Sequence, residues 1–224
     1  MNQHVIIVAG GSGTRMNSAV PKQFLQLNGK AIIIRTIEKF FAFNPDIQII
    51  VVVHQDYLDL FTMLLKTSSV KREKIKITKG GESRFESVKN GLTCLDSQNG
   101  IVGIHDAARP FVSIGTIASC YGVAELKGNA IPCIAIHESL RQINGDNNSV
   151  VNRDKFKIIQ TPQCFEITLI KKAFEQAYRD SFTDDDTVVE TGGIKINLVE
   201  GNIENIKITS PADLIIAKAF CEHE

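Results

Sequence analysis

The sequence predicts an α/β fold built on a doubly wound, mostly parallel sheet. Short apolar runs alternate with helix-length amphipathic segments along residues 1–136. The apolar runs are unbroken and rich in β-branched residues, as expected for strands that are buried on both faces. Strands that alternate with helices in this way pair in parallel, and the helices cover both faces of the sheet.

The individual elements follow from these runs in chain order. We expect strands at Val5–Ala9, Ile47–Val53, Ile75–Thr78, Ile101–His105 and Ala130–Ile136. We expect helices at Ala31–Phe43, Leu58–Thr67, Ser83–Leu95 and Ile114–Lys127. Later elements are a helix at Leu169–Arg179, a strand at Lys195–Val199 and a final helix from Pro211. Ser210 is a favourable N-cap for that last helix, with Pro211 in its first position and Asp213 in its first turn.

Residues 137–156 interrupt the α/β alternation. Two short extended arms flank an Asn/Gly/Asp-rich turn at 144–148, which predicts a β-hairpin. We therefore expect one Rossmann-like domain, residues 1–224, with 137–156 as a projecting arm. Such an arm has to bury its apolar side chains, and a second subunit is one way to do so.

Bulk properties exclude several classes of protein. Hydrophobic residues make up 43% and charged residues 22% of the chain, which is ordinary for a globular protein, and the formal net charge is zero. A general nucleic-acid binder needs a net basic face, so nucleic acid is not an expected partner. The five Cys are scattered without metal-ligand spacing or a disulfide framework, which favours a reducing cytoplasm. We see neither a signal peptide nor an apolar run of the ~20 residues that span a bilayer.

A glycine-rich turn follows the first predicted strand. The chain reads Ala9-Gly10-Gly11-Ser12-Gly13, with Arg15 and Lys22 soon after. Glycines at this place let the backbone approach a phosphate chain closely, although a simple tight turn is the alternative. The two cations favour the phosphate interpretation, because they can offset the charge that develops on a phosphorus under attack. Positioning and charge stabilisation suffice for phosphoryl-type transfer.

A second polar cluster follows the predicted strand at 101–105. Ligands of such sheets bind beyond the carboxyl ends of the strands, where Asp106 and Arg109 fall. Asp106 is a candidate ligand of Mg²⁺ or of a substrate hydroxyl, since Mg²⁺ prefers one or two carboxylates with phosphate oxygens and water. The alternative is that Asp106 caps the next turn and pairs with Arg109. We interpret His105 as a structural hydrogen-bonding residue and the acidic run after Thr183 as a helix start, with Thr183 as N-cap.

An ordered set of motifs resembles the 2-C-methyl-D-erythritol 4-phosphate cytidylyltransferases along essentially the whole chain. The matching residues are Gly11–Met16, Pro21–Phe24, Gly80–Arg84 with Ser87-Val88, His105–Pro110, Asn152-Arg153, Gln160–Gln163, Thr183–Asp185, Glu200-Gly201 and Asn205–Thr209.

The resemblance implies a role for each matching position. Arg15 and Lys22 would stabilise the transition state at the α-phosphorus of CTP, and the turn Ala9, Gly10, Gly11, Ser12 and Gly13 would hold the triphosphate. Gly81, Glu82 and Ser87 would surround the cytosine. Arg153 and Lys207 would bind the phosphate of methylerythritol phosphate, with Asp106, Arg109, Ser139, Thr161 and Thr183 as further substrate contacts. The arm would cross to a partner subunit, so that a homodimer exchanges Arg153 between its active sites.

Two other interpretations stay open. Ribitol 5-phosphate cytidylyltransferases resemble the same family, although the Ala107–Pro110 and Ser87–Gly91 sequences favour methylerythritol phosphate as the acceptor. A non-catalytic nucleotide-binding protein could share the fold, because fold alone does not give function. The intact set of candidate cations argues against that class.

Overall fold

The computed structural model describes residues 2–11 and 20–222, and in them a central sheet of eight strands organises the fold. The strand order is β10-β7-β11-β6-β1-β4-β5, and β12 pairs with β7. These strands are β1 (Gln3–Ala9), β4 (Gln48–Val53), β5 (Ile75–Lys79), β6 (Ile101–Asp106), β7 (Asn129–Ala135), β10 (Lys157–Ile159), β11 (Gln163–Glu166) and β12 (Leu198–Glu200). Two small hairpins lie outside the sheet and consist of β2 (Gln26–Leu27) with β3 (Lys30–Ala31), and β8 (Arg141–Asn144) with β9 (Asn147–Val150).

The sheet is mostly parallel. Strand β1 pairs in parallel with both β4 and β6, β4 pairs in parallel with β5, and β12 pairs in parallel with β7. Strand β11 lies antiparallel between β6 and β7, and β10 is antiparallel to β7. The predicted α/β class with a largely parallel sheet is therefore confirmed. The two antiparallel strands, which we did not predict, are formed by the chain as it returns from the arm.

Helices cover both faces of the sheet. Along β1, Val5 and Ile7 pack into one buried cluster, whereas Ile6 between them packs into the other. The first cluster includes residues of α1 (Ile32–Phe43), α2 (Leu58–Thr67) and α4 (Ile114–Lys127). The second includes residues of α3 (Arg84–Thr93), α5 (Ile167–Ala173) and α6 (Asp185–Glu190). The C-terminal helix α7 (Pro211–Cys221) packs near β2 in a third, smaller cluster.

Local chemistry explains the helix ends. Ser210 and Asp213 form a capping box at the start of α7 with Pro211 in its first turn, as the sequence predicts. The prediction that the helix from Leu169 continues to Arg179 is wrong. Helix α5 ends at Ala173, whose carbonyl accepts a hydrogen bond from the side chain of Gln176.

Two further boundaries differ from the prediction. Asp184 rather than Thr183 is the N-cap of α6, because the Asp184 carboxylate accepts the Asp185 N–H. Strand β12 begins at Leu198 rather than Lys195, because Lys195 and Asn197 bond to the side chain of Asn129. Short 3-10 turns complete the described elements at η2 (Lys22–Phe24), η3 (Gln55–Tyr57), η4 (Arg72–Lys74) and η5 (Arg153–Lys155).

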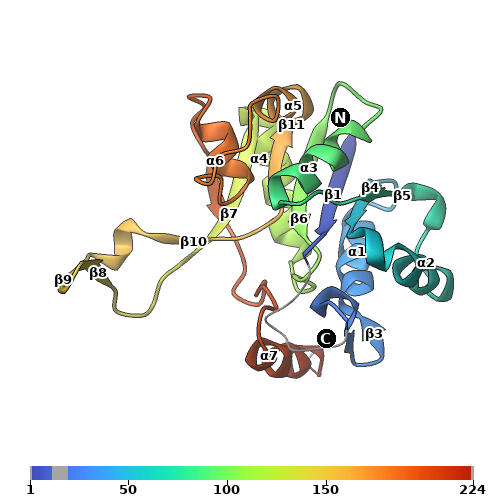
Figure 1. Ribbon diagram of the computed structural model, residues 1–224, viewed down its shortest axis with the longest axis horizontal. Coiled ribbons are helices and arrows are strands. Elements are labelled where there is room, and N and C mark those ends of the chain that lie inside the picture. Colours follow the sequence, from blue (N-terminus) through green and yellow to red (C-terminus); the bar gives the residue numbers. More distant parts are fainter. Residues whose placement is uncertain (1, 12–19, 223–224) are drawn as a thin grey trace.

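The predicted hairpin extends away from the body of the molecule on two stretches of chain (Figure 1). Its side chains are exposed throughout β8 and β9, including the apolar Ile143 and Val150. None of the helices that the structure describes has the length and apolar character needed to cross a membrane.

Candidate active site

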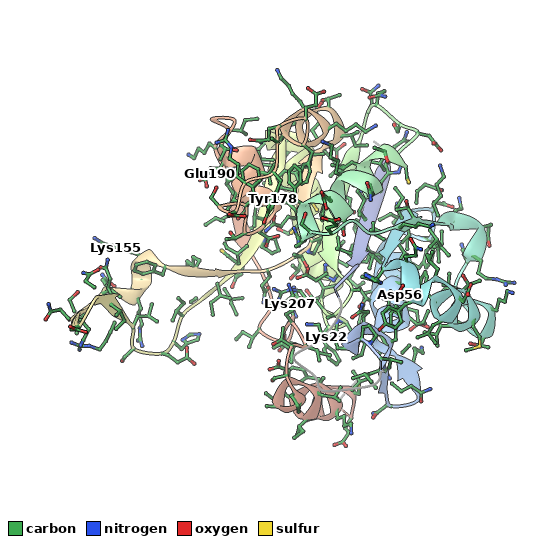
Figure 2. All side chains as sticks on the ribbon, in the orientation of Figure 1. Lys22, Asp56, Lys155, Tyr178, Glu190 and Lys207 are labelled. Carbon is green, nitrogen blue, oxygen red and sulfur yellow. The ribbon has the colours of Figure 1, made fainter. Side chains whose placement is uncertain are left out.

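A pocket of about 390 Å³ lies at the carboxyl edge of the parallel strands. Strands β1 and β6 end there at Ala9 and Asp106, and both residues line the pocket. Its wall also includes Lys22 and Lys207, which are labelled near each other in Figure 2. Two lysines that face one concave surface supply positive charge for an anionic ligand.

The glycine-rich turn forms one wall of this pocket. Ala9, Gly10 and Gly11 line it, whereas Ser12, Gly13 and Arg15 lie outside the described residues. A Cβ atom on Gly10 would lie 2.9 Å from the hydroxyl oxygen of Ser87. The close approach of the turn to helix α3, which carries Ser87, therefore favours a glycine at this point.

A second loop, after β5, faces the turn. Gly81, Glu82 and Ser87 all line the pocket, so the structure brings together the three residues predicted to surround a base. Ser87 is 2% exposed, and its hydroxyl accepts the Gly81 N–H at 3.1 Å. Ser83 and Glu86 form a capping box at the start of α3, which fixes this loop to the helix.

Asp106 is the acidic centre of the site. Its Oδ2 lies 2.9 Å from Lys207 Nζ and 3.2 Å from Arg109 Nε, and its Oδ1 lies 3.8 Å from Arg84 Nε. Burial alone would raise the pKa of Asp106, but the charges of Lys207, Arg84 and Arg109 outweigh burial and hold that pKa well below its usual value. The carboxylate is therefore ionised at neutral pH and can accept hydrogen bonds or ligate a cation.

His105 and Thr161 form a buried hydrogen-bond network with the backbone of Asp106. The Thr161 hydroxyl accepts the Asp106 N–H at 3.1 Å and lies 3.0 Å from His105 Nδ1. The other ring nitrogen, Nε2, lies 3.1 Å from the Arg109 carbonyl oxygen, which fits a neutral ring that donates from Nε2. Burial lowers the pKa of His105 to about 4. These contacts agree with a structural rather than a catalytic His105.

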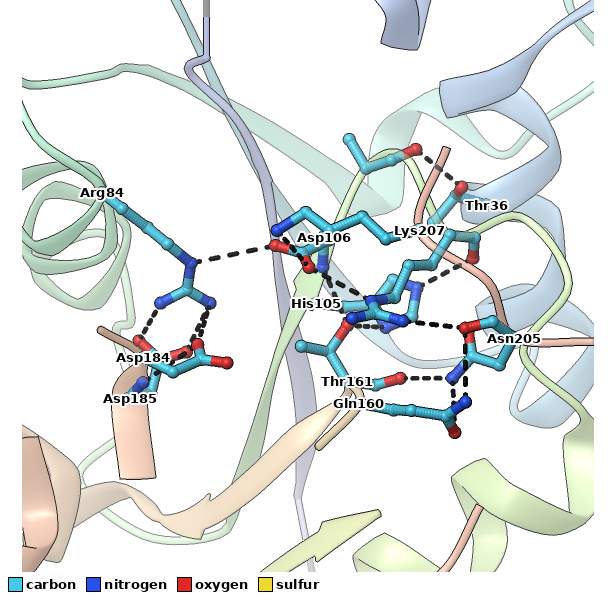
Figure 3. Close-up of polar contacts among 12 residues, drawn as sticks. Thr36, Arg84, His105, Asp106, Gln160, Thr161, Asp184, Asp185, Asn205 and Lys207 are labelled. Carbon is cyan, nitrogen blue, oxygen red and sulfur yellow. Dashed lines mark hydrogen bonds and ion pairs between the residues drawn. The ribbon is translucent and has the colours of Figure 1, made fainter. Parts of the chain in front are cut away.

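Thr161 is fully buried and its hydroxyl already has these two partners. Thr161 is therefore not among the residues that line the pocket. The sequence had suggested that it contacts the substrate. Asn205 continues the network, because its side chain donates to the Thr161 carbonyl and its own carbonyl accepts from Arg109 (Figure 3). This network places the segment that carries Lys207 beside Asp106.

The remaining predicted contacts lie elsewhere. Ser139 and Arg153 are both on the arm, where the Arg153 guanidinium donates to the His137 carbonyl. Thr183 is exposed and does not line the pocket. Within one chain, the structure does not bring these three residues to Lys22 and Lys207.

An ion-pair cluster around Arg84, which lines the pocket, was missed as a unit by sequence reasoning. Arg84 donates to both carboxylate oxygens of Asp185, at 2.8 and 2.6 Å, and its Nη2 lies 2.9 Å from Asp184 Oδ1 (Figure 3). Burial alone would lower the pKa of Arg84, but the carboxylates of Asp185, Asp184 and Asp106 outweigh it and raise that pKa. The arginine therefore stays charged and links α6 to the loop that carries Gly81 and to Asp106.

We expect Arg84→Ala to destabilise the protein strongly, because it leaves the fully buried Asp185 carboxylate without its bidentate partner. Breaking a buried ion pair from one side costs about 3–5 kcal/mol. The double variant Arg84→Ala/Asp185→Ala should recover part of this loss, and Arg72→Ala on the exposed turn η4 should cost little. Urea unfolding of the four proteins measures these differences, and equal losses in the double and the Arg84→Ala variants would contradict the pairing.

The pocket offers few protein ligands for Mg²⁺. Among the described residues, no group of three or more His, Cys, Asp or Glu side chains could hold a metal ion. Two carboxylate side chains line the pocket, those of Glu82 and Asp106, and of these Asp106 pairs with Lys207. This donor set fits an ion held mainly by substrate phosphate oxygens with one protein carboxylate, which is a usual arrangement for Mg²⁺.

The fold and the pocket together are those expected of a nucleotide-binding α/β transferase, because backbone glycines and lysines line one cavity at the carboxyl edge of a parallel sheet. Residues 3–223 match the family model described as "IspD: 2-C-methyl-D-erythritol 4-phosphate cytidylyltransferase". The chain belongs to this family.

Individual relatives agree with the family match. The chain is 47% identical over 220 residues to the 2-C-methyl-D-erythritol 4-phosphate cytidylyltransferase of Phocaeicola vulgatus, with 98% of this chain and 100% of the relative covered. The protein of the same name from Bacteroides thetaiotaomicron is 44% identical with the same coverage.

Solved structures show the same fold. The 4-diphosphocytidyl-2C-methyl-D-erythritol synthase of Anaerococcus prevotii is 28% identical and superposes with a TM-score of 0.84, covering 99% of this chain and 96% of that one. The Francisella tularensis 2-C-methyl-D-erythritol 4-phosphate cytidylyltransferase is 32% identical with a TM-score of 0.79, covering 98% and 99%.

Proposed function

We propose that the pocket at the carboxyl edge of the sheet carries out the reaction of the family. The protein is an enzyme that joins the CMP part of CTP to 2-C-methyl-D-erythritol 4-phosphate. The products are 4-diphosphocytidyl-2-C-methyl-D-erythritol and pyrophosphate, and the reaction is a step of the non-mevalonate route to isoprenoid precursors. The observation that carries the proposal for the pocket is that Lys22, Lys207 and the loop of Gly81 line one cavity.

The chemistry needs no covalent intermediate. A phosphate oxygen of the acceptor attacks the α-phosphorus in line, and the bond to the β-phosphate oxygen breaks as pyrophosphate leaves. Lys22, together with Arg15, offsets the negative charge that grows on the α-phosphate in the transition state. The acceptor phosphate is already deprotonated at neutral pH, so no general base is required.

Each wall of the pocket has a separate task in this proposal. Gly10 and Gly11, with Ser12 and Gly13 beyond the described part, hold the triphosphate, and Gly81, Glu82 and Ser87 select the base. Lys207 binds the acceptor phosphate from a position that Asp106 and Arg109 fix. Mg²⁺, when bound through Asp106 and phosphate oxygens, would neutralise part of the charge of the triphosphate.

We further propose that residues 1–224 form one catalytic domain and that residues 137–156 complete the site of a partner subunit. The arm carries Arg153 and Ser139 away from the pocket of its own chain. Ile143 is 68% exposed and Val150 is 75% exposed on this arm, and apolar side chains of that kind commonly mark an interface. A second copy of the chain would cover them and receive Arg153.

A pyrophosphate-release assay that crosses four NTPs with two acceptors tests the proposed function. We expect release only with CTP and 2-C-methyl-D-erythritol 4-phosphate in the presence of Mg²⁺. A preference for ribitol 5-phosphate would change the acceptor, and no release with any pair would indicate a non-catalytic nucleotide-binding protein.

A further inference from the structure

The side chain of Gln23 bonds to both ends of the turn Ala9–Gly11, which is the described part of the glycine-rich segment. Its Nε2 donates to the Ala9 carbonyl at 2.8 Å and to the Gly11 carbonyl at 3.2 Å, so both amide protons are used. Gln23 is only 3% exposed although it lines the pocket. A buried amide needs such partners, and the loss of the amide would remove the partner of the buried Ala9 carbonyl and release the carbonyl of the exposed Gly11.

These hydrogen bonds set the direction of the backbone at the turn. The carbonyl of one residue and the N–H of the next point to opposite sides of one planar trans peptide. Because Gln23 draws the Ala9 oxygen to its own side, the Gly10 N–H is turned away from Gln23. A fixed N–H direction is what a phosphate-binding turn needs, since the backbone donors then do not have to reorganise when the ligand binds.

The position of Gln23 is itself fixed by the core. Phe24, the next residue, is 5% exposed, and its ring centre lies 5.6 Å from that of Tyr57. The turn η2 is closed by backbone hydrogen bonds from Phe24 N to Pro21 O and from Leu25 N to Lys22 O. One short, anchored turn therefore presents Lys22 to the pocket and holds the glycine-rich turn through Gln23.

We infer that Gln23 is a positioning residue that holds the Ala9–Gly11 turn in the conformation that binds the triphosphate of CTP. This inference rests on the proposed function and adds a residue to it. Gln23 acts through the backbone of the turn, so its loss should weaken the binding of CTP and leave the binding of the acceptor unchanged.

The test is Gln23→Met, which keeps the length of the side chain and removes both donors. We expect the Kd of CTP from calorimetry without acceptor, and the KM for CTP, to rise roughly tenfold or more, as the loss of buried hydrogen bonds implies. The KM for 2-C-methyl-D-erythritol 4-phosphate at saturating CTP should stay within about twofold, which is below the usual effect of one lost hydrogen bond.

Gln176→Met is the matched control. Gln176 Nε2 also donates to two backbone carbonyls, those of Ala173 at 2.8 Å and Val188 at 2.9 Å, but it does not line the pocket. This variant should lower the melting temperature without changing the Kd of CTP. An unchanged Kd in Gln23→Met, a parallel rise in both KM values, or an equal rise in Gln176→Met would each overturn the inference.

A second measurement covers the case in which Gln23→Met does not fold. In the unaltered protein, the side-chain amide protons of Gln23 should exchange much more slowly with solvent than those of the exposed Gln55. Equal exchange rates would refute the hydrogen bonds between Gln23 and the turn, and with them the inference. The calorimetry needs no turnover, so it measures the role of Gln23 independently of the reaction. If the unaltered protein binds CTP but releases no pyrophosphate, the proposed reaction is refuted and the role of Gln23 can still be tested.

Discussion

Replacement of Lys22 by alanine should lower kcat by about 10²–10³, because one preorganised charge that stabilises the transition state is lost. Lys22 lines the pocket beside the glycine-rich turn and is held there by the anchored turn η2. Its ammonium is already in place for the charge that grows at the α-phosphorus, whereas water in its place would have to reorganise. Steady-state rates of pyrophosphate release at saturating CTP and acceptor measure the effect, and circular dichroism checks that the fold survives.

The Lys66→Ala variant is the control for this prediction, because Lys66 lies on the exposed surface of α2. It should turn over at the rate of the unaltered protein. Arg15→Ala should behave like Lys22→Ala if both cations act on the same phosphate. Turnover close to that of the unaltered protein in Lys22→Ala would exclude the assigned role.

Arg153→Ala should raise the KM for 2-C-methyl-D-erythritol 4-phosphate strongly, since a charge-assisted contact to the acceptor phosphate disappears. Arg153 lies on the arm, outside the pocket of its own chain. If the arm completes the site of a partner, the lesion acts in the neighbouring subunit. A mixture of the two impaired variants, Lys22→Ala and Arg153→Ala, assayed at an acceptor concentration below the raised KM, can then regain activity.

The expected recovery follows from the symmetry of a homodimer. Random exchange of equal amounts of the two variants makes half of the dimers mixed, and each mixed dimer has one site without any lesion, so about a quarter of the original activity returns. If both residues served the same chain, no site in the mixture would be intact. Activity after co-refolding, compared with each variant alone, distinguishes the two cases, and the absence of recovery would contradict arm exchange.

Much of this architecture follows from local sequence patterns. The buried strands β1, β4 and β6 each contain an apolar run, and the residues at their carboxyl ends meet at one edge because parallel strands end there together. The capping box at Ser210 and the hairpin turn at residues 145–146 are likewise local signals. Asp106 could be placed from its position at the end of a strand, whereas Gly81, Ser87 and Lys207 could be placed only through the motifs of the family.

Other features depend on contacts between distant parts of the chain. Arg84 and Asp185 are 101 residues apart, and an acidic run at a helix start looks the same whether or not a buried arginine pairs with it. Thr161 lies in a motif that suggests a substrate contact, but its burial depends on how β11 enters the sheet beside β6. Periodicity does not reveal either arrangement, because both are decided by tertiary packing.

We propose above that the transfer of CMP from CTP to 2-C-methyl-D-erythritol 4-phosphate takes place in this pocket. The most direct test is kcat/KM for pyrophosphate release over the panel of four NTPs and two acceptors, with the product identified by mass spectrometry. We expect kcat/KM for CTP with 2-C-methyl-D-erythritol 4-phosphate to exceed that for every other pair by orders of magnitude, with the CDP-linked compound as the product. An equal or higher kcat/KM with ribitol 5-phosphate or another NTP, or no pyrophosphate at all, would contradict it.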